Sequence, residues 1–163
     1  MSRFTIINTD MWMDKEVRAM TPTEKLVWTY LLTSPLGNAA GFYRLPEDQV
    51  EFTLGKDAAT ILHKPTKLYK YDAASEQVFI TNYLKYNTAK SQQQMKGIAS
   101  AVKSLERCEL FIDFVYSMNR FCGAEALQYF DKRLLDYIRV ISGQKDDMHS
   151  VVVNKLITTH INE

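Results

Sequence analysis

The sequence predicts a mainly α-helical protein with a small β-hairpin, arranged as a winged helix-turn-helix followed by a helical subdomain. Three observations lead to this fold class: a capped helix at residues 22–33, a strand and two short helices at residues 41–64, and a pair of strands ending at residue 84. This order of elements is that of a winged helix-turn-helix, a fold that most often binds DNA. We assign residues 1–90 to this domain and residues 91–163 to a C-terminal helical extension.

Local signals define the first helix, residues 22–33. Thr21 suits the N-cap, Pro22 the first helical position and Glu24 the third, so Thr21 and Glu24 can form a capping box. Pro35 lies just beyond the end of the helix. The spacing of its apolar residues predicts a buried stripe of Leu26, Val27, Tyr30 and Leu31.

Further aromatic residues are expected in the core, because a chain that is 46% hydrophobic can bury a substantial one. Residues 10–20 predict one or two helical turns with Trp12 and Val17 pointing inward. We also assign the aromatic residues at positions 28, 30, 42 and 52 to the core.

The centre of the predicted domain begins with a short strand at residues 41–45. Pro46 then suits the first turn of a helix, and Gly55 is a natural C-cap for it. Asp57 is expected to cap a second short helix at residues 58–64, in the position of a recognition helix. A proline at the next position ends that helix.

A β-hairpin, the wing, is expected from strands at residues 68–71 and 77–84 with a turn at 72–76, because these strands are rich in β-branched and aromatic residues. The remainder is predicted to be helical, with either helix or strand at residues 148–161. Its apolar residues form three sets with helical spacing. The first is Met95, Ile98, Ala99, Val102 and Leu105, and the second is Leu110, Phe111, Phe114, Val115 and Met118. The third lies on a helix of about 124–141 and consists of Leu127, Phe130, Leu134, Tyr137, Ile138 and Ile141.

Charge is unevenly distributed, although the net charge is only +1. Residues 56–105 hold eight lysines and three acids, a local charge of +5, and contain no arginine. This block indicates either a surface that faces a polyanion or an ordinary solvated lysine face. Arginine is the usual reader of guanine, so binding to DNA would be driven by the phosphate backbone and only weakly sequence-specific.

The candidate DNA-binding residues lie on or beside the second short helix and around the wing. They are Lys56, Thr60, His63, Lys64 and Lys67 for the helix, and Lys70, Lys85, Lys90 and Lys96 around and after the wing, with Asn87 beside them. Five phosphate contacts would give a log–log salt slope near −4.5, hence roughly 500-fold weaker binding between 50 and 200 mM salt.

Patterns of catalysis and metal binding are missing from the sequence. The glycines form no phosphate loop, the histidines and cysteines form no metal-ligand pattern, and there is no nucleophile elbow. We therefore expect a protein that is not an enzyme and has no cofactor.

Cys108 and Cys122 are expected as reduced thiols, with a bridge possible but unneeded. No signal peptide and no membrane-length apolar run is found, so a cytoplasmic location is expected.

Short segments in a characteristic order carry a resemblance to a known family. They are INTDMW (7–12), TPTEKL (21–26), YLLTSP (30–35), AGFYRLP (40–46), FITNYLKYN (79–87) and KGI (96–98). Over residues 4–118 the sequence resembles the N-terminal winged-helix region of DnaD-like replication initiation proteins, or replisome organisers, of phages of low-GC Gram-positive bacteria. The resemblance implies DNA binding near a replication origin, self-association, and recruitment of a host replication protein such as a helicase loader, in the host cytoplasm.

A second function remains open on the residues themselves. Neutral net charge, the lack of arginine and the short helix in the recognition position suit a module that uses the same fold to bind and modulate a host protein instead of DNA. The C-terminal helices either pack on the winged helix or form the interface of a homo-oligomer, because three amphipathic helices exceed what a small winged helix can cover.

Overall fold

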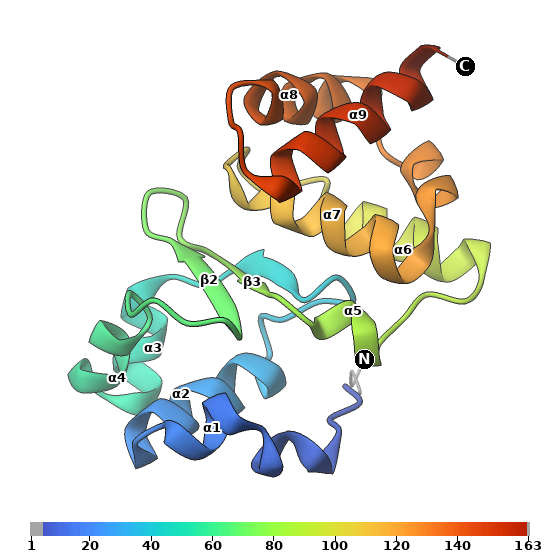
Figure 1. Cartoon of the computed structure of the whole chain (residues 1–163). Coiled ribbons are helices and arrows are strands. Elements are labelled where there is room, and N and C mark those ends of the chain that lie inside the picture. Colours follow the sequence, from blue (N-terminus) through green and yellow to red (C-terminus); the bar gives the residue numbers. More distant parts are fainter. Residues whose placement is uncertain (1–4, 163) are drawn as a thin grey trace. The chain divides into compact units, whose positions relative to one another are not determined.

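The computed structural model describes residues 5–162 and is mainly helical, with 61% helix and a small antiparallel sheet of three strands (Figure 1). The chain divides into two compact units after Asn87, which we call unit 1 and unit 2. The predicted boundary lies three residues later, after residue 90.

Unit 1 contains short helices around the sheet. Its elements are the 3-10 helix η1 (Thr9–Met13), α1 (Lys15–Ala19), α2 (Pro22–Thr33), β1 (Phe42–Arg44), α3 (Glu47–Leu54), α4 (Lys56–Ile61), β2 (Tyr69–Asp72), β3 (Gln77–Ile80) and α5 (Tyr83–Tyr86). Helix α4 packs against both α2 and α3 (Figure 1). Strand β3 is central in the sheet order β1-β3-β2, and all four of its residues are buried.

Helix α2 has the predicted bounds and the predicted cap. The Thr21 hydroxyl accepts a hydrogen bond from the Glu24 backbone at 3.2 Å, and the Glu24 carboxylate accepts one from the Thr21 backbone at 2.7 Å. This capping box satisfies two backbone donors that the helix itself leaves unpaired. The buried face consists of Val27, Trp28 and Leu31, whereas Leu26, which we had placed in the stripe, is 49% exposed.

Two other residues predicted to point inward are exposed. Trp12 is 52% exposed, while Val17 is buried as expected. Phe52 is 90% exposed, because it follows the buried Val50 by two positions on helix α3. A step of two residues turns a helix by about 200°, so the alternation that suits a strand places Phe52 on the opposite face from Val50.

The predicted strand over residues 77–84 is only half a strand. Strand β3 ends at Ile80, whose backbone N–H donates to the Gly41 carbonyl at 2.8 Å, and the chain then turns into helix α5.

The predicted cap at Asp57 is also wrong. Gly55, with φ at +95°, is the residue before helix α4, so Asp57 lies inside the first turn and makes no side-chain cap.

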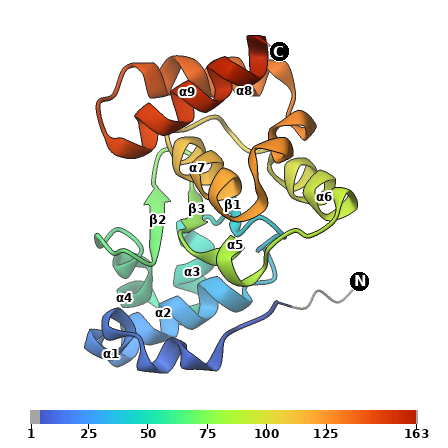
Figure 2. The same ribbon diagram turned by 45° about the vertical axis from the view of Figure 1, so that its right-hand side comes forward.

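Unit 2 is entirely helical among its described residues. It comprises α6 (Gln92–Val102), α7 (Leu110–Cys122), the 3-10 helix η2 (Ala124–Tyr129), α8 (Lys132–Gly143) and α9 (Met148–Asn162) (Figure 2). Helix α9 packs on α7 and α8, which decides the open choice for residues 148–161 in favour of a helix. Both cysteines are buried and neither is part of a disulfide, and burial raises the pKa of the Cys122 thiol.

The single helix predicted at residues 124–141 is two elements. The chain changes direction at Phe130, and the Asp131 carboxylate then accepts a hydrogen bond from the Leu134 backbone at 2.9 Å. This bond makes Asp131 the N-cap of α8. The apolar spacing continues across the break, because Leu127 of η2 and Leu134 and Ile138 of α8 are all buried.

Candidate nucleic-acid interface

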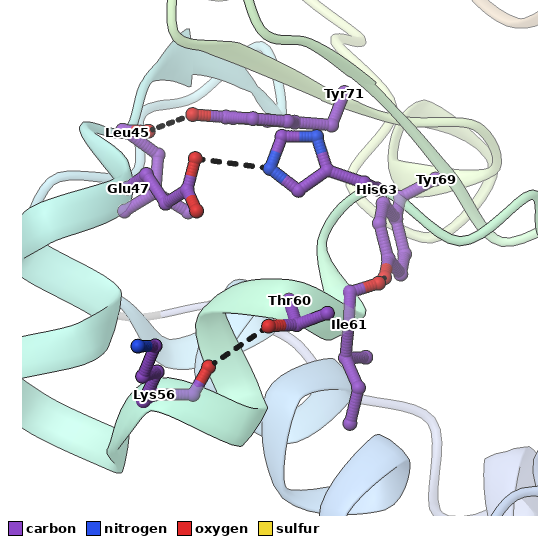
Figure 3. A network of polar contacts seen from close by, with 8 residues as sticks. All are labelled: Leu45, Glu47, Lys56, Thr60, Ile61, His63, Tyr69 and Tyr71. Atoms are coloured by element: carbon purple, nitrogen blue, oxygen red, sulfur yellow. Dashed lines mark hydrogen bonds and ion pairs between the residues drawn. The ribbon is translucent and has the colours of Figure 1, made fainter.

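Helix α4 presents a narrow polar face to solvent. It has six residues, of which Ala58, Ala59 and Ile61 are buried. The exposed residues are Lys56, Asp57 and Thr60. The Thr60 hydroxyl donates to the Lys56 carbonyl at 3.2 Å (Figure 3), so this threonine already has an intrahelical partner.

His63 lies in the turn after α4 and reaches back to the start of α3. Its Nε2 atom is 3.0 Å from Glu47 Oε2, and its ring and the Tyr71 ring lie edge to face at a centroid distance of 5.3 Å (Figure 3). These contacts hold the turn to both α3 and the sheet. His63 nevertheless stays at the surface. A ligand could bind it by replacing only its exposed contact with Glu47.

Two of the candidate lysines are paired with acids. Lys64 Nζ lies 3.0 Å from Glu24 Oε1, and Lys67 Nζ lies 3.3 Å from Glu16 Oε1. The hydrogen bond from the Thr21 backbone and that from Lys64 together lower the pKa of Glu24 to about 2, so it stays charged at neutral pH. A phosphate bound here must replace these carboxylates. Exposed pairs of this kind contribute little to stability, because water and salt screen them.

The remaining candidates are spread over both units. Lys70 is exposed on β2, and Lys85 on α5 lies over the Tyr86 ring at 5.3 Å. Asn87 is bonded to the N-terminal segment, where its side chain accepts from the Ile6 backbone at 3.2 Å. Lys90 and Lys96 belong to unit 2. Unit 1 therefore contains only the candidates from residues 56–87.

The tip of the β2–β3 hairpin is acidic, because two of the three acids of residues 56–105 lie there. Asp72 accepts a hydrogen bond from the Ser75 hydroxyl. Glu76, at a positive φ of 51°, forms an ion pair with Arg44 at 2.6 Å. Of these residues only Arg44 offers a cation to a polyanion, and it was outside the predicted set. A phosphate is therefore expected at α4 and along β2 rather than at the hairpin tip.

Two tyrosine hydroxyls anchor the segments around α4. Tyr69 donates to the Ile61 carbonyl and Tyr71 to the Leu45 carbonyl, each at 3.0 Å (Figure 3). Burial is the main cause that raises the pKa of each phenol to about 12. Both tyrosines thus serve the fold, because their hydroxyls hold the end of α4 and the segment before α3 to the sheet.

Alkaline unfolding tests the role of Tyr69, which is 4% exposed. Its folded pKa lies above the value near 10 of an unfolded chain, so its stabilisation is complete below pH 10 and is lost as pH rises toward 12. Tyr69→Phe should cost about 1 kcal/mol at pH 7 through the lost hydrogen bond. At pH 12 the variant should be the more stable protein. Urea unfolding at pH 7, 10 and 12 measures both, and parallel pH profiles would contradict the assignment.

The described residues contain neither a membrane-spanning helix nor a metal-binding cluster. Within residues 5–162 no helix has the length and apolar character needed to cross a membrane. The same part of the chain holds no cluster of histidine, cysteine and acidic side chains arranged to bind a metal ion. Comparison with protein-family models, with curated proteins and with solved structures gave no match.

Proposed function

We propose that unit 1 is a winged helix that binds duplex DNA through the phosphate backbone, within a non-enzymatic, phage-type replication initiation protein. The observation that carries the proposal is topological. The elements run in the order α2, β1, α3, α4, β2, β3, and the strands in the order β1-β3-β2. This order agrees with that of winged-helix domains, and it supports α4 as the counterpart of the helix that enters the major groove.

The surface at α4 supports contacts with phosphates rather than with bases. Lys56 and Thr60 face solvent on the helix, and Lys64 and Lys67 follow it. These lysines are point charges on flexible stems, which suit phosphate oxygens but not bidentate recognition of a base. The acids paired with Lys64 and Lys67 reduce the local positive charge, so binding is weak. Because it depends on phosphate contacts, binding also falls as the salt concentration rises.

The sequence resemblance to replisome organisers supports the wider role. It covers residues 4–118, hence all of the elements that build the winged-helix arrangement. On this basis the protein self-associates and recruits a host replication protein such as a helicase loader in the host cytoplasm.

A paired charge reversal tests the DNA contact. The variant Lys56→Glu/Lys67→Glu changes one lysine at the start of α4 and one that pairs with Glu16. We expect the log–log salt slope for a fluorescent 20-base-pair duplex to shrink by about 1.8, and the affinity at 50 mM salt to fall more than about tenfold. Fluorescence anisotropy between 50 and 200 mM salt measures both quantities.

The matched control is Lys145→Glu/Lys155→Glu in unit 2. It also changes one ion-paired lysine, since Lys145 lies 2.5 Å from Glu109, and one exposed lysine on α9. This control should keep at least half of the wild-type affinity. Equal losses in the two variants, or no salt-sensitive binding by the wild type, would refute binding at α4.

A second function, a protein-interaction module, is favoured by Phe52. Its ring is 90% exposed on α3, where Asp48 and Glu51 are also exposed. Exposed aromatic residues are typical anchors of protein interfaces, and these acids would repel DNA. If this function holds, Phe52→Ser abolishes binding to a host replication protein while Lys56→Glu/Lys67→Glu leaves it unchanged. If the DNA function holds, Phe52→Ser leaves duplex affinity unchanged.

A further inference from the structure

Unit 2 contains a groove that the proposed function of unit 1 does not use. The groove has a volume of about 320 Å³ and lies between α6, the end of η2 and the start of α8. Its apolar floor is formed by the buried residues Ala99, Phe130 and Leu134. Polar and charged side chains form its walls, namely Lys96, Ser100, Lys103, Tyr129 and Asp131.

One wall of the groove is a polar row along α6. Lys96, Ser100 and Lys103 follow each other at steps of four and three residues, which places them on one helix face. Lys96 and Lys103 stand about 10.5 Å apart along the helix axis, at about 1.5 Å per residue. Among the described residues 5–162, neither lysine forms an ion pair with a carboxylate.

The lysines of this groove differ in this respect from Lys64 and Lys67 of unit 1. Each of those two has an acid within ion-pair distance, so an incoming phosphate must compete with a carboxylate. Lys96 and Lys103 need no such exchange. The groove therefore offers an anion more uncompensated positive charge than the pair of lysines that follows α4.

The second wall offers an aromatic surface. Tyr129 ends η2 and is half-buried, and Lys96 Nζ lies 5.7 Å from the centroid of its ring. A cation–π contact at an exposed site is weak, so the ammonium group can leave the ring for a phosphate at little cost. A cation and a ring side by side suit a ligand that carries a phosphate next to a flat base.

The single acid in the groove wall is already engaged. Asp131 accepts the hydrogen bond from the Leu134 backbone as the N-cap of α8, and the positive end of that helix stabilises its charge. Its carboxylate can also accept a hydrogen bond from an exocyclic amino group of a base. An amino-bearing base beside Tyr129 is therefore compatible with this residue.

We propose that this groove binds single-stranded nucleic acid, with phosphates on Lys96 and Lys103 and an unstacked base on Tyr129. A single phosphate would occupy only one of two lysines that stand two helical turns apart. Bases in a duplex are stacked inside the helix and leave no face for a tyrosine ring. Lysines that follow a backbone beside an aromatic ring that stacks on bases are the usual elements of a single-strand site.

The test uses the full-length chain and fluorescent 20-nucleotide probes of oligothymidylate, oligodeoxycytidylate and oligouridylate at 50 mM salt. Lys96→Glu/Lys103→Glu should weaken binding more than about tenfold and reduce the salt slope by about 1.4. Tyr129→Leu should weaken it about 5-fold to 150-fold, because stacking contributes about 1–3 kcal/mol per base. Tyr129→Phe, which keeps the ring, should remain within about twofold of wild type.

Several outcomes would overturn the site. These are no binding of any single strand, unchanged binding by Lys96→Glu/Lys103→Glu, equal losses in Tyr129→Phe and Tyr129→Leu, or displacement of the probe by thymidine monophosphate as readily as by unlabelled oligothymidylate. The variant Lys56→Glu/Lys67→Glu separates the two proposals. It should lose duplex binding and keep single-strand binding, so either proposal can fail without the other.

Discussion

Replacing Gly41 by alanine is expected to lower the free energy of unfolding of unit 1 by about 3 kcal/mol. Gly41 has φ at +62°, a conformation that costs an L-residue about 1–2 kcal/mol. An added Cβ would also collide with the Cβ and ring carbons of Tyr83, which cannot rotate away like the end of a long side chain. Urea unfolding and hydrogen exchange of the Ile80 amide, which bonds to the Gly41 carbonyl, measure the loss.

The same change at Gly97 provides the control. Gly97 lies inside helix α6, and a Cβ there would meet no atom within 4 Å. Gly97→Ala should therefore raise the stability of unit 2 by about 0.5–1 kcal/mol, since glycine is a poor residue in a helix interior. If Gly41→Ala were as stable as wild type, the close contact with Tyr83 would be disproved.

Truncation of Phe114 to alanine should destabilise unit 2 by about 3–5 kcal/mol. Phe114 is fully buried on α7, and its ring meets Phe111 at 6.4 Å and Phe130 at 5.9 Å, both edge to face. Removing it leaves a cavity and ends both aromatic contacts. Denaturant unfolding followed by circular dichroism measures the loss.

The matched control is Phe121→Ala on the same helix. Phe121 is half-buried, and the Arg120 guanidinium carbon lies 5.3 Å from the centroid of its ring. We expect its truncation to cost about 1 kcal/mol. Similar losses in the two variants would mean that Phe114 is not at the centre of the core.

The helices that were predicted accurately carry their signals within a few residues. Thr21 and Glu24 define the start of α2 because a capping box needs only four consecutive residues. The break before α8 carried the same kind of signal, since Asp131 directly precedes a helical apolar pattern. It was missed because the apolar spacing continues across it.

The electrostatics of the candidate site could not be predicted in the same way. The pair between Lys64 and Glu24 joins residues 40 positions apart, so it depends on the packing of α4 against α2. A local charge of +5 over residues 56–105 is therefore a property of the sequence, not of the surface at α4. The exposure of Phe52, by contrast, follows from local geometry, because the helix before Gly55 was predicted and a step of two residues from the buried Val50 leads to its opposite face.

The DNA contact of unit 1 is tested most directly by nuclear magnetic resonance of the isotope-labelled full-length chain titrated with a 20-base-pair duplex. We expect amide shifts concentrated on α4 and the segment after it, residues 56–70, with Lys56 among the largest. The amides around Phe52 on the acidic face of α3 should move little. Shifts absent from residues 56–70, or centred on Phe52, would contradict DNA binding at α4 and favour the protein-interaction function.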